Sequence, residues 1–317
     1  MGDFMKTLVF AAKHKNKEVL KNSSSGGAFT ALTDVFLEEG NALLCSHYNY
    51  ETNLTEFHLV ESFKDRDASR GSMYLQSDAK DSWKSGLHWL REHCDKKLMF
   101  VGVGCQAAGF LKFAEMNHVS DRVITVDIIC HGSPSPMIWK EYIESVCGKK
   151  ELSQVNFRDK RTGWAHSVGI AVIDGEDVSI KKYRTLYSGR YTLRKCCSEC
   201  PYTVINRKTD MTIGDFWHIE KSMPDFADEE GISLVLIHSE KGKELFDSVM
   251  GSMEVRQSNT TDCWQMNLEK PTQHSEKRQQ FWRDYNKHGI DYVMDKYGTV
   301  STLTKVKRKL ASVIRKV

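Results

Sequence analysis

Two apolar runs in the first half of the chain are each followed closely by a cysteine. Residues 98–103 lead through a glycine to Cys105, and residues 123–129 lead directly to Cys130. Short apolar runs of this kind are typical of buried strands, and ligands of α/β proteins gather at the carboxyl ends of parallel strands. The pattern therefore predicts a sheet that carries both thiols at the same edge.

Strand-like and helix-like segments alternate along much of the chain. Apolar residues recur at helical spacing over 28–40, 83–93 and 107–116. Further strands are expected at 7–12, 42–45, 56–60, 168–173, 178–180 and 232–237. The expected fold class is α/β with α+β elements: a mixed, partly parallel sheet flanked by helices, with a cysteine-bearing C-terminal subdomain and a helical tail.

The composition is that of a soluble globular protein, with 40% hydrophobic and 27% charged residues. No run approaches the roughly 20 apolar residues of a membrane helix. The apolar stretch 8–12 is shorter than the core of a signal peptide, which has about 7–15 residues. We therefore expect a cytoplasmic protein with reduced thiols, whose nine scattered cysteines are metal ligands or buried thiols and no disulfide framework.

The distribution of charge argues against a nucleic-acid partner. The formal net charge is +3, but residues 301–317 contain six basic and no acidic side chains, so the remaining chain is weakly acidic. A nucleic-acid-binding protein needs a basic face with stacking or base-reading residues. The tail at 305–317 has an apolar stripe at helical spacing, which indicates contact with a membrane surface or a helix packed on the body.

A further cysteine motif is the pair Cys197 and Cys200, which is followed by Pro201. A lone Cys-x-x-Cys pair is half of a zinc site, a redox dithiol or no site at all. No apolar strand precedes the pair, which disfavours a thioredoxin-like role, and structural zinc usually draws on two close pairs. One pair and two single cysteines at strand ends favour an iron–sulfur cluster, whereas each single cysteine alone is as easily a packed thiol.

Three other segments are candidates for binding anions or protons. The Ser/Gly segment 23–27 precedes a predicted helix, whose free N–H groups would bind a phosphate; the alternative is an ordinary serine cap. His131 is either a proton donor or a structural histidine. Arg158, Lys160 and Arg161 would clamp an anionic substrate, or belong to a solvated charged loop.

Eight motifs, in order along the chain, resemble the coenzyme F420 hydrogenase/dehydrogenase β-subunit family, and in particular its members from bacterial polysaccharide-biosynthesis gene clusters. The motifs are 24–27, 71–77, 104–109, 130–136, 157–160, 197–201, Arg207 with 210–217, and 231–234. Each motif is weak by itself, but eight in order are specific.

The resemblance implies a flavin, FAD, and a four-iron, four-sulfur (4Fe-4S) cluster. The implied cluster ligands are Cys105, Cys130, Cys197 and Cys200. The implied FAD contacts are Ser24, Ser25, Gly26, Gly27, Ser72, Tyr74, Gln76, Ser77, Gln106, Arg158 and Lys160. Electrons would pass singly through the cluster and in pairs at the flavin, with His131 as the catalytic proton donor.

The chain departs from the family pattern at several positions. Met73 stands where the family usually has lysine, which makes coenzyme F420 itself a doubtful cofactor. Val103 and Gly104 replace a Thr-Pro pair, and His218 follows Trp217 in place of glycine. A ferredoxin-like segment with close-set cysteines, which many relatives carry at the N-terminus, is lacking. We therefore expect a ferredoxin-like electron partner in trans.

Together these patterns predict three functional regions. They are an N-terminal flavin-phosphate-binding region at 1–93, a cluster and flavin region at 94–258, and a helical basic tail at 259–317. The expected function is an FAD and iron–sulfur oxidoreductase in bacterial polysaccharide or sugar biosynthesis. A sugar-modifying transferase and a non-redox adaptor on the same scaffold are the alternatives.

Overall fold

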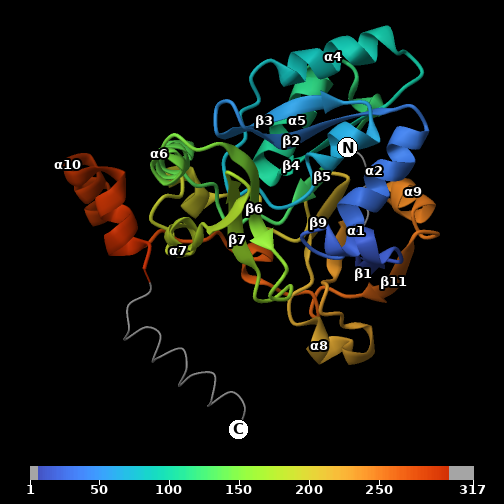
Figure 1. Ribbon diagram of the computed structural model, residues 1–317. Coiled ribbons are helices and arrows are strands. Elements are labelled where there is room, and N and C mark those ends of the chain that lie inside the picture. Colours follow the sequence, from blue (N-terminus) through green and yellow to red (C-terminus); the bar gives the residue numbers. More distant parts are fainter. Residues whose placement is uncertain (1–5, 300–317) are drawn as a thin grey trace.

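An eight-stranded mixed sheet forms the centre of the molecule (Figure 1). The structure is a computed structural model, and it describes residues 6–299. Along the sheet the strand order is β11-β1-β10-β9-β5-β4-β2-β3. The strands are β1 (Leu8–His14), β2 (Ala42–Asn49), β3 (Leu54–Val60), β4 (Leu98–Val103), β5 (Val123–Ile128), β9 (Met211–Asp215), β10 (Ser233–Ile237) and β11 (Met253–Ser258).

The four central strands β2, β4, β5 and β9 run parallel, while the outer pairs are antiparallel. This arrangement confirms the predicted mixed, partly parallel sheet. Val103 at the end of β4 is paired with Ile128 at the end of β5. Because the two strands end at the same level, the cysteines that follow them emerge at one edge of the sheet.

Alternation of side chains along the strands gives the sheet two apolar faces. Leu43, Met99 and Val101 pack with helices α2 (Ala28–Glu38) and α9 (Glu240–Ser248). On the opposite face, Leu44 and Phe100 pack with α4 (Ser82–Glu92) and α5 (Gly104–Met116). In Figure 1, α4 lies at the top of the view, whereas α2 and α9 lie next to each other at the right. Both faces are thus covered by helices, as expected for an α/β core.

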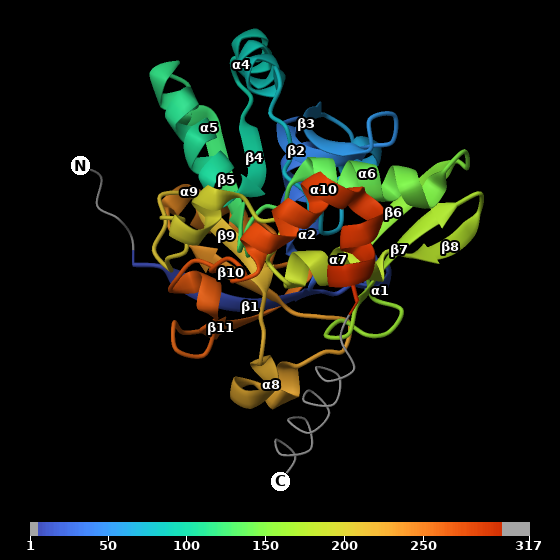
Figure 2. The ribbon, with the colours of Figure 1, turned by 90° about the vertical axis from the view of Figure 1, so that its left-hand side faces the viewer.

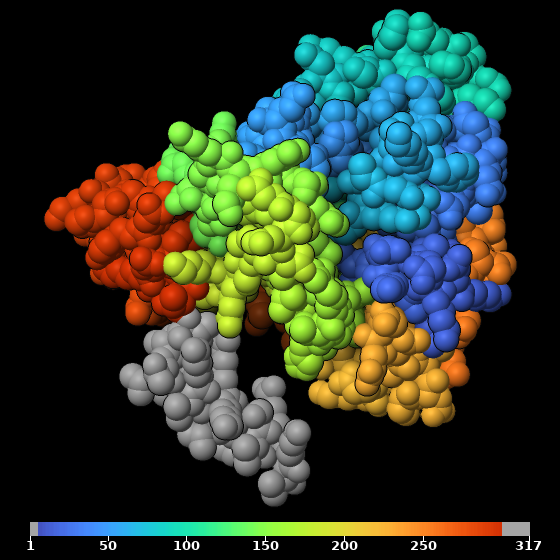
Figure 3. Space-filling model, in the orientation of Figure 1, coloured from blue at the N-terminus to red at the C-terminus, as the bar shows by residue number. Residues whose placement is uncertain are grey.

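A second unit has its own small sheet and its own core. Strands β6 (Leu152–Asp159), β7 (Val168–Ile173) and β8 (Glu176–Ser179) form an antiparallel sheet. Helices α6 (Pro136–Cys147), α7 (Lys181–Ser188) and α10 (Arg278–Tyr297) pack beside it (Figure 2). Trp139, Tyr183 and Phe281 are fully buried in this core. In the space-filling view the second unit, in green, lies against the N-terminal part of the chain, in blue (Figure 3).

Short helices complete the described part of the chain. They are α1 (Lys17–Lys21), α3 (Phe63–Asp67), η1 (Ser120–Arg122), η2 (Lys195–Glu199), α8 (Ile219–Ser222), η3 (Pro224–Phe226) and η4 (Met266–Leu268). No helix within residues 6–299 combines the length and the apolar composition that crossing a membrane requires. The predicted amphipathic tail at 305–317 lies outside the described residues.

The predicted helices and strands agree with the structure, with two differences. The helix after β4 begins at Gly104, so Cys105 lies in its first turn, whereas the sequence predicted a start at residue 107. Strands β6, β9 and β11 were not predicted, because charged residues or glycine interrupt their apolar pattern. The main sheet contains strands from before and after residue 93, the predicted end of the first functional region. The division into three functional regions stays a prediction.

Gly242 allows α9 to lie directly on the main sheet. An added Cβ at this position would lie 2.4 Å from the carbonyl oxygen of Asp210. We predict that Gly242→Ala destabilises the protein by about 1–3 kcal/mol, the usual cost of overpacking a rigid contact. Gly251→Ala is the matched control, because an added Cβ there meets nothing within 4 Å, and its effect should stay within about 0.5 kcal/mol. Equal urea unfolding midpoints for the two variants would contradict this account of the α9 contact.

Candidate functional site

Backbone pairing between two loops brings two cysteine-bearing segments together. The N–H group of Ser135 donates to the carbonyl of Thr192, and that of Arg194 donates to the carbonyl of Ser133, both at 2.9 Å. Gly132, with φ of 108°, approaches so closely that an added Cβ would lie 3.5 Å from the Cβ of Cys197. The loop after β5 therefore lies directly on the segment of the cysteine pair.

Backbone N–H groups point at two of the predicted cluster sulfurs. The N–H of Gly132 donates to Sγ of Cys130 at 3.3 Å, and the N–H of Ser133 donates to Sγ of Cys197 at 3.4 Å. Hydrogen bonds of this kind favour the thiolate form, and around iron–sulfur clusters they tune the reduction potential. The loop is thus suited to hold thiolate ligands.

The thiols at this site influence one another's pKa. Burial, with a smaller contribution from the thiols of Cys105, Cys197 and Cys200, raises the pKa of Cys130 to about 12. Burial also raises the pKa of Cys105 and of Cys197, to which the neighbouring cysteines add. In the absence of a metal these three thiols are protonated at neutral pH, so binding of a metal or cluster must release protons.

The spacing of the sulfurs distinguishes between two kinds of metal site. Four thiolates around one zinc ion lie about 3.8 Å apart, because each Zn–S bond is about 2.3 Å long. Within residues 6–299, no three cysteine sulfurs lie within 4.8 Å of one another. The described thiols are thus not gathered at the spacing of a single zinc site, and a cluster of several iron atoms takes its thiolates at a wider spacing. The donor set of thiolates with N–H bonds fits such a cluster.

A buried ion pair joins two of the segments that carry these cysteines. Nη1 of Arg207 donates to Oδ1 of Asp127 at 2.9 Å, and the hydroxyl of Thr209 donates to the other carboxylate oxygen at 3.0 Å. Both charged side chains are almost completely buried. The pair links the end of β5 to the segment that follows Cys200. One signal for it is visible in the sequence, since Asp127 is a charged residue inside an apolar strand.

A cavity of about 380 Å³ opens at the same edge of the main sheet. Its wall combines the start of α2, the loop at 69–77, the ends of β4, β5 and β9, and the loop at 128–134. Of the predicted cofactor contacts, the following line it: Ser24, Ser25, Gly27, Ser72, Tyr74, Ser77, Gln106 and Arg158. Cys130 and His131 line it as well. The predicted cluster and cofactor regions thus share part of one wall.

The start of α2 offers unused hydrogen-bonding groups to the cavity. Gly27 precedes the helix in a left-handed conformation with φ of 84°, and no serine of the segment 23–25 caps it, although the N–H of Ala28 donates to Oγ of Ser233 at 3.4 Å. The hydroxyl of Ser72 donates to that of Ser24 at 2.9 Å, which joins the two predicted phosphate-binding loops. The buried hydroxyl of Thr30 has no partner within the described residues. A helix start of this kind is favourable for an anion.

Arg158 is held rigidly at the cavity wall. Its Nη1 donates to Oδ2 of Asp215 at 2.5 Å, and Nε1 of Trp164 donates to the other oxygen of that carboxylate at 2.8 Å. The ring of Trp217 stacks on Trp164 with centroids 4.8 Å apart and lies under the guanidinium group. Nη2 of Arg158 is buried without a partner among the described residues. One donor of the guanidinium is therefore available to a ligand.

His131 is suited to accept a proton. Burial lowers its pKa, and the nearby Asp215 only partly opposes that effect. The imidazole is thus neutral at pH 7 and lines the cavity next to Cys130.

Three predicted cofactor contacts do not line the cavity. The ammonium group of Lys160 donates to the carbonyls of Leu20 at 2.6 Å and Glu230 at 2.5 Å, and burial lowers its pKa to about 8. Gly26 packs on the sheet, where an added Cβ would lie 2.3 Å from the carbonyl oxygen of Ala12. Gln76 lies in the loop at 69–77 but is not part of the wall. Their predicted cofactor contacts stay untested, although Lys160 and Gly26 have clear structural roles.

Met73 lies in the cavity wall, so the departure from the family's lysine concerns the site itself. Its sulfur accepts a hydrogen bond from the hydroxyl of Ser46 at 3.5 Å. Sequence reasoning missed several other wall residues that are apolar or lie far from any motif. They include Cys45, Arg184 and Tyr187; Thr30, three residues beyond the motif at 24–27, was missed as well.

Comparison with known proteins gives two findings. The family model for the C-terminal part of the coenzyme F420 hydrogenase/dehydrogenase beta subunit matches residues 95–262, slightly more than half of the chain. A chain in the xenon-derivatised F420-reducing [NiFe] hydrogenase complex from Methanosarcina barkeri has a similar fold, with a TM-score of 0.53 and 18% sequence identity over 93% of this chain and 92% of that chain. No curated protein matches the sequence significantly.

The ion pair of Asp127 and Arg207 provides a test of how the cysteine loops are supported. We predict that Asp127→Asn lowers the free energy of unfolding by about 3–5 kcal/mol, because it leaves a buried guanidinium without a charged partner. Asp81→Asn is the control, since that carboxylate forms an exposed pair with Lys84. Its unfolding curve should coincide with that of the wild type. A small effect of Asp127→Asn in urea unfolding would show that the pair does not support the site.

Proposed function

This chain belongs to the coenzyme F420 hydrogenase/dehydrogenase β-subunit family, and on that premise we propose that it is an FAD and iron–sulfur oxidoreductase subunit. In this proposal FAD occupies the cavity, and a 4Fe-4S cluster is held by Cys105, Cys130, Cys197 and Cys200. The flavin would exchange electron pairs with the substrate, and the cluster would exchange single electrons with a partner.

The observation that carries the proposal is the double role of Cys130. It belongs to the group of cysteines whose thiols influence one another, and it also lines the cavity beside His131. A cluster on this cysteine would therefore lie against a ligand in the cavity, which is the arrangement that electron transfer between two cofactors needs. Neither a transferase nor an adaptor would require thiols at that wall.

The cavity offers suitable contacts for the phosphates of FAD. The start of α2, where one N–H group donates to Ser233, presents the backbone N–H groups that follow it, and the guanidinium of Arg158 supplies a positive charge with one unused donor. His131, neutral and buried, would take up the proton released when a substrate is oxidised, and it would have to be protonated first in order to deliver one during reduction. The apolar side chain of Met73 adds no charge to this wall, which supports FAD and leaves coenzyme F420 doubtful.

Electrons are proposed to arrive from a ferredoxin-like partner in trans. Cys196 and Val204 flank the cysteine pair and are exposed. The segment that would carry two of the cluster ligands therefore reaches the surface, where a partner has access to it. The proposed substrate is a sugar or polysaccharide precursor, on the resemblance to members of bacterial polysaccharide-biosynthesis gene clusters.

The cluster assignment is tested by removing single cysteines. We predict that Cys197→Ser abolishes cluster assembly, because a serine hydroxyl does not replace a thiolate ligand of iron. Protein purified anaerobically and reconstituted with iron and sulfide should lose its broad visible absorption and its bound iron.

Two other cysteines serve as controls for this experiment. Cys196→Ser changes the adjacent exposed thiol, and Cys263→Ser changes a buried thiol in a different core. Both variants should keep the iron content of the wild type. Equal iron content in all three variants would refute the ligand assignment, and a wild type without iron or flavin after reconstitution would refute the proposed function.

The flavin assignment is tested at Arg158. We predict that Arg158→Gln weakens FAD binding by about 10- to 100-fold, since a hydrogen bond to a charged group contributes about 1.5–3 kcal/mol. Arg161→Gln is the matched control, because that guanidinium is exposed and paired with Asp159 and Asp177. Quenching of flavin fluorescence during titration of the deflavinated protein measures both affinities. Wild-type affinity in Arg158→Gln would remove this residue from the flavin site.

A further inference from the structure

The edge hairpin of the main sheet carries three metal-binding side chains on one face. His47 on β2 is paired directly with Glu56 on β3, and His58 follows two residues later on β3. In a strand, residues two apart point to the same face, so the three side chains converge. One donor atom from each lies within 4.8 Å of the other two. The group is separate from the predicted cluster ligands and does not line the cavity.

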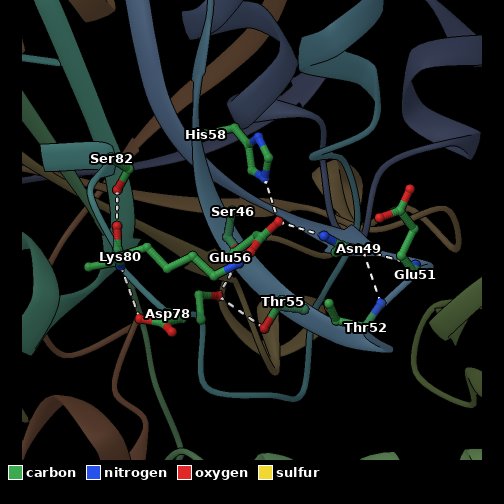
Figure 4. Close-up of polar contacts among 12 residues, drawn as sticks. Ser46, Asn49, Glu51, Thr52, Thr55, Glu56, His58, Asp78, Lys80 and Ser82 are labelled. Atoms are coloured by element: carbon green, nitrogen blue, oxygen red, sulfur yellow. Dashed lines mark hydrogen bonds and ion pairs between the residues drawn. The ribbon is translucent and has the colours of Figure 1, made fainter. Parts of the chain in front are cut away.

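The distances within this group are those of neighbouring ligands of one metal ion. Nε2 of His58 lies 3.1 Å from Oε1 of Glu56 (Figure 4). Adjacent ligands of a first-row metal ion lie about 3.0–3.5 Å apart, because its bonds to nitrogen and oxygen are about 2.1 Å long. The rings of His47 and His58 face each other with centroids 3.3 Å apart, so both imidazoles stand beside the carboxylate of Glu56, and one ring must turn for both nitrogens to reach one ion.

The carboxylate of Glu56 is held in place and ionised. It is buried, its Oε1 accepts a hydrogen bond from Asn49 at 2.7 Å, and its Oε2 is paired with the ammonium group of Lys80. These contacts, with the lysine contributing most, lower the pKa of Glu56 to about 2. Burial lowers the pKa of His47, and the neighbouring His58 lowers it further. An ionised carboxylate and a neutral imidazole are the forms that bind metals.

The simpler interpretation is an ordinary buried ion pair between Glu56 and Lys80. That pair, with Asn49 and His58, accounts for both oxygens of the carboxylate (Figure 4). It does not account for His47, whose ring makes no hydrogen bond within residues 6–299 and yet lies against His58. In a metal site the lysine and the asparagine would orient the carboxylate from behind, as partners of metal ligands commonly do.

We propose that His47, Glu56 and His58 bind one divalent transition-metal ion, with water in the remaining coordination positions. Two imidazoles and one carboxylate suit zinc and its neighbours in the first transition row better than calcium or magnesium. The ion links the edge strand β3 to β2. Since β2 also carries Cys45 and Ser46 in the cavity wall, the ion stiffens that side of the cavity. The site is independent of the proposed flavin and cluster.

Zinc binding by the full-length protein tests the proposal. Equilibrium dialysis with Zn²⁺ should show one bound ion fewer in the double variant His47→Asn/His58→Asn than in the wild type. His88→Asn is the matched control, because it removes an exposed histidine that lies 3.2 Å from Glu92 on α4. All three proteins keep every cysteine, so zinc bound by thiols cancels in the comparison. The same stoichiometry in all three proteins would overturn the proposal.

Two further measurements guard against a double variant that does not fold. In the presence of a chelator it should melt at the temperature of the chelated wild type, and only the wild type and His88→Asn should gain thermal stability with Zn²⁺. Anomalous scattering at the zinc edge, from crystals of the wild type, should place an ion between His47 and His58. A zinc peak at the cysteines alone, or at no protein site, would overturn the proposal even if the variant is unfolded.

Discussion

The buried ion pair between Asp127 and Arg207 is the contact on which the cysteine loops depend. It joins the end of a central parallel strand to the segment that follows the cysteine pair, 80 residues further along the chain. Its guanidinium also lies 3.4 Å from where a Cβ would be placed on Gly104, the first residue of α5. One pair thus contacts the three segments that carry Cys105, Cys130 and the Cys197–Cys200 pair. Because both side chains are buried, water cannot take the place of either partner if the pair separates. The pair therefore holds the three segments in fixed relative positions.

Much of the fold was predictable because the central strands are buried on both faces. The run before Cys105 is apolar throughout and the run before Cys130 is interrupted only by Thr125 and Asp127, and strands of this kind leave a clear sequence signal. Strands β9 and β11 leave a weaker signal, since β9 ends in Gly214 and Asp215 and β11 is an edge strand with exposed residues. The start of α5 at Gly104 depends on contacts with Tyr202 and Arg207, which no local pattern reveals.

The parts of the candidate site that lie in short motifs of characteristic residue type, such as the Ser/Gly segment, were predictable from the sequence. The Ser/Gly segment and the loop at 71–77 meet at the cavity, as the motifs indicated. Charge alone was less informative: Arg158 reaches the cavity wall, whereas Lys160, just beyond the end of β6, is bound by two backbone carbonyls. The group of His47, Glu56 and His58 depends on the register of the β2–β3 hairpin, which a search along the sequence does not supply.

The position of β1 in the sheet determines the order in which the protein can fold. This strand is made before the others, yet its two neighbours are β10 and β11, more than 200 residues later. During synthesis the backbone N–H and C=O groups of β1 have no partner strand until the C-terminal half has been made. The strands β2, β4 and β5 can already pair with one another by then. Pairings between such distant segments are formed slowly and expose unpaired edges to aggregation. Chains interrupted before residue 258 would lack a complete sheet, so ribosomes that stall late would release products that need chaperones or proteases.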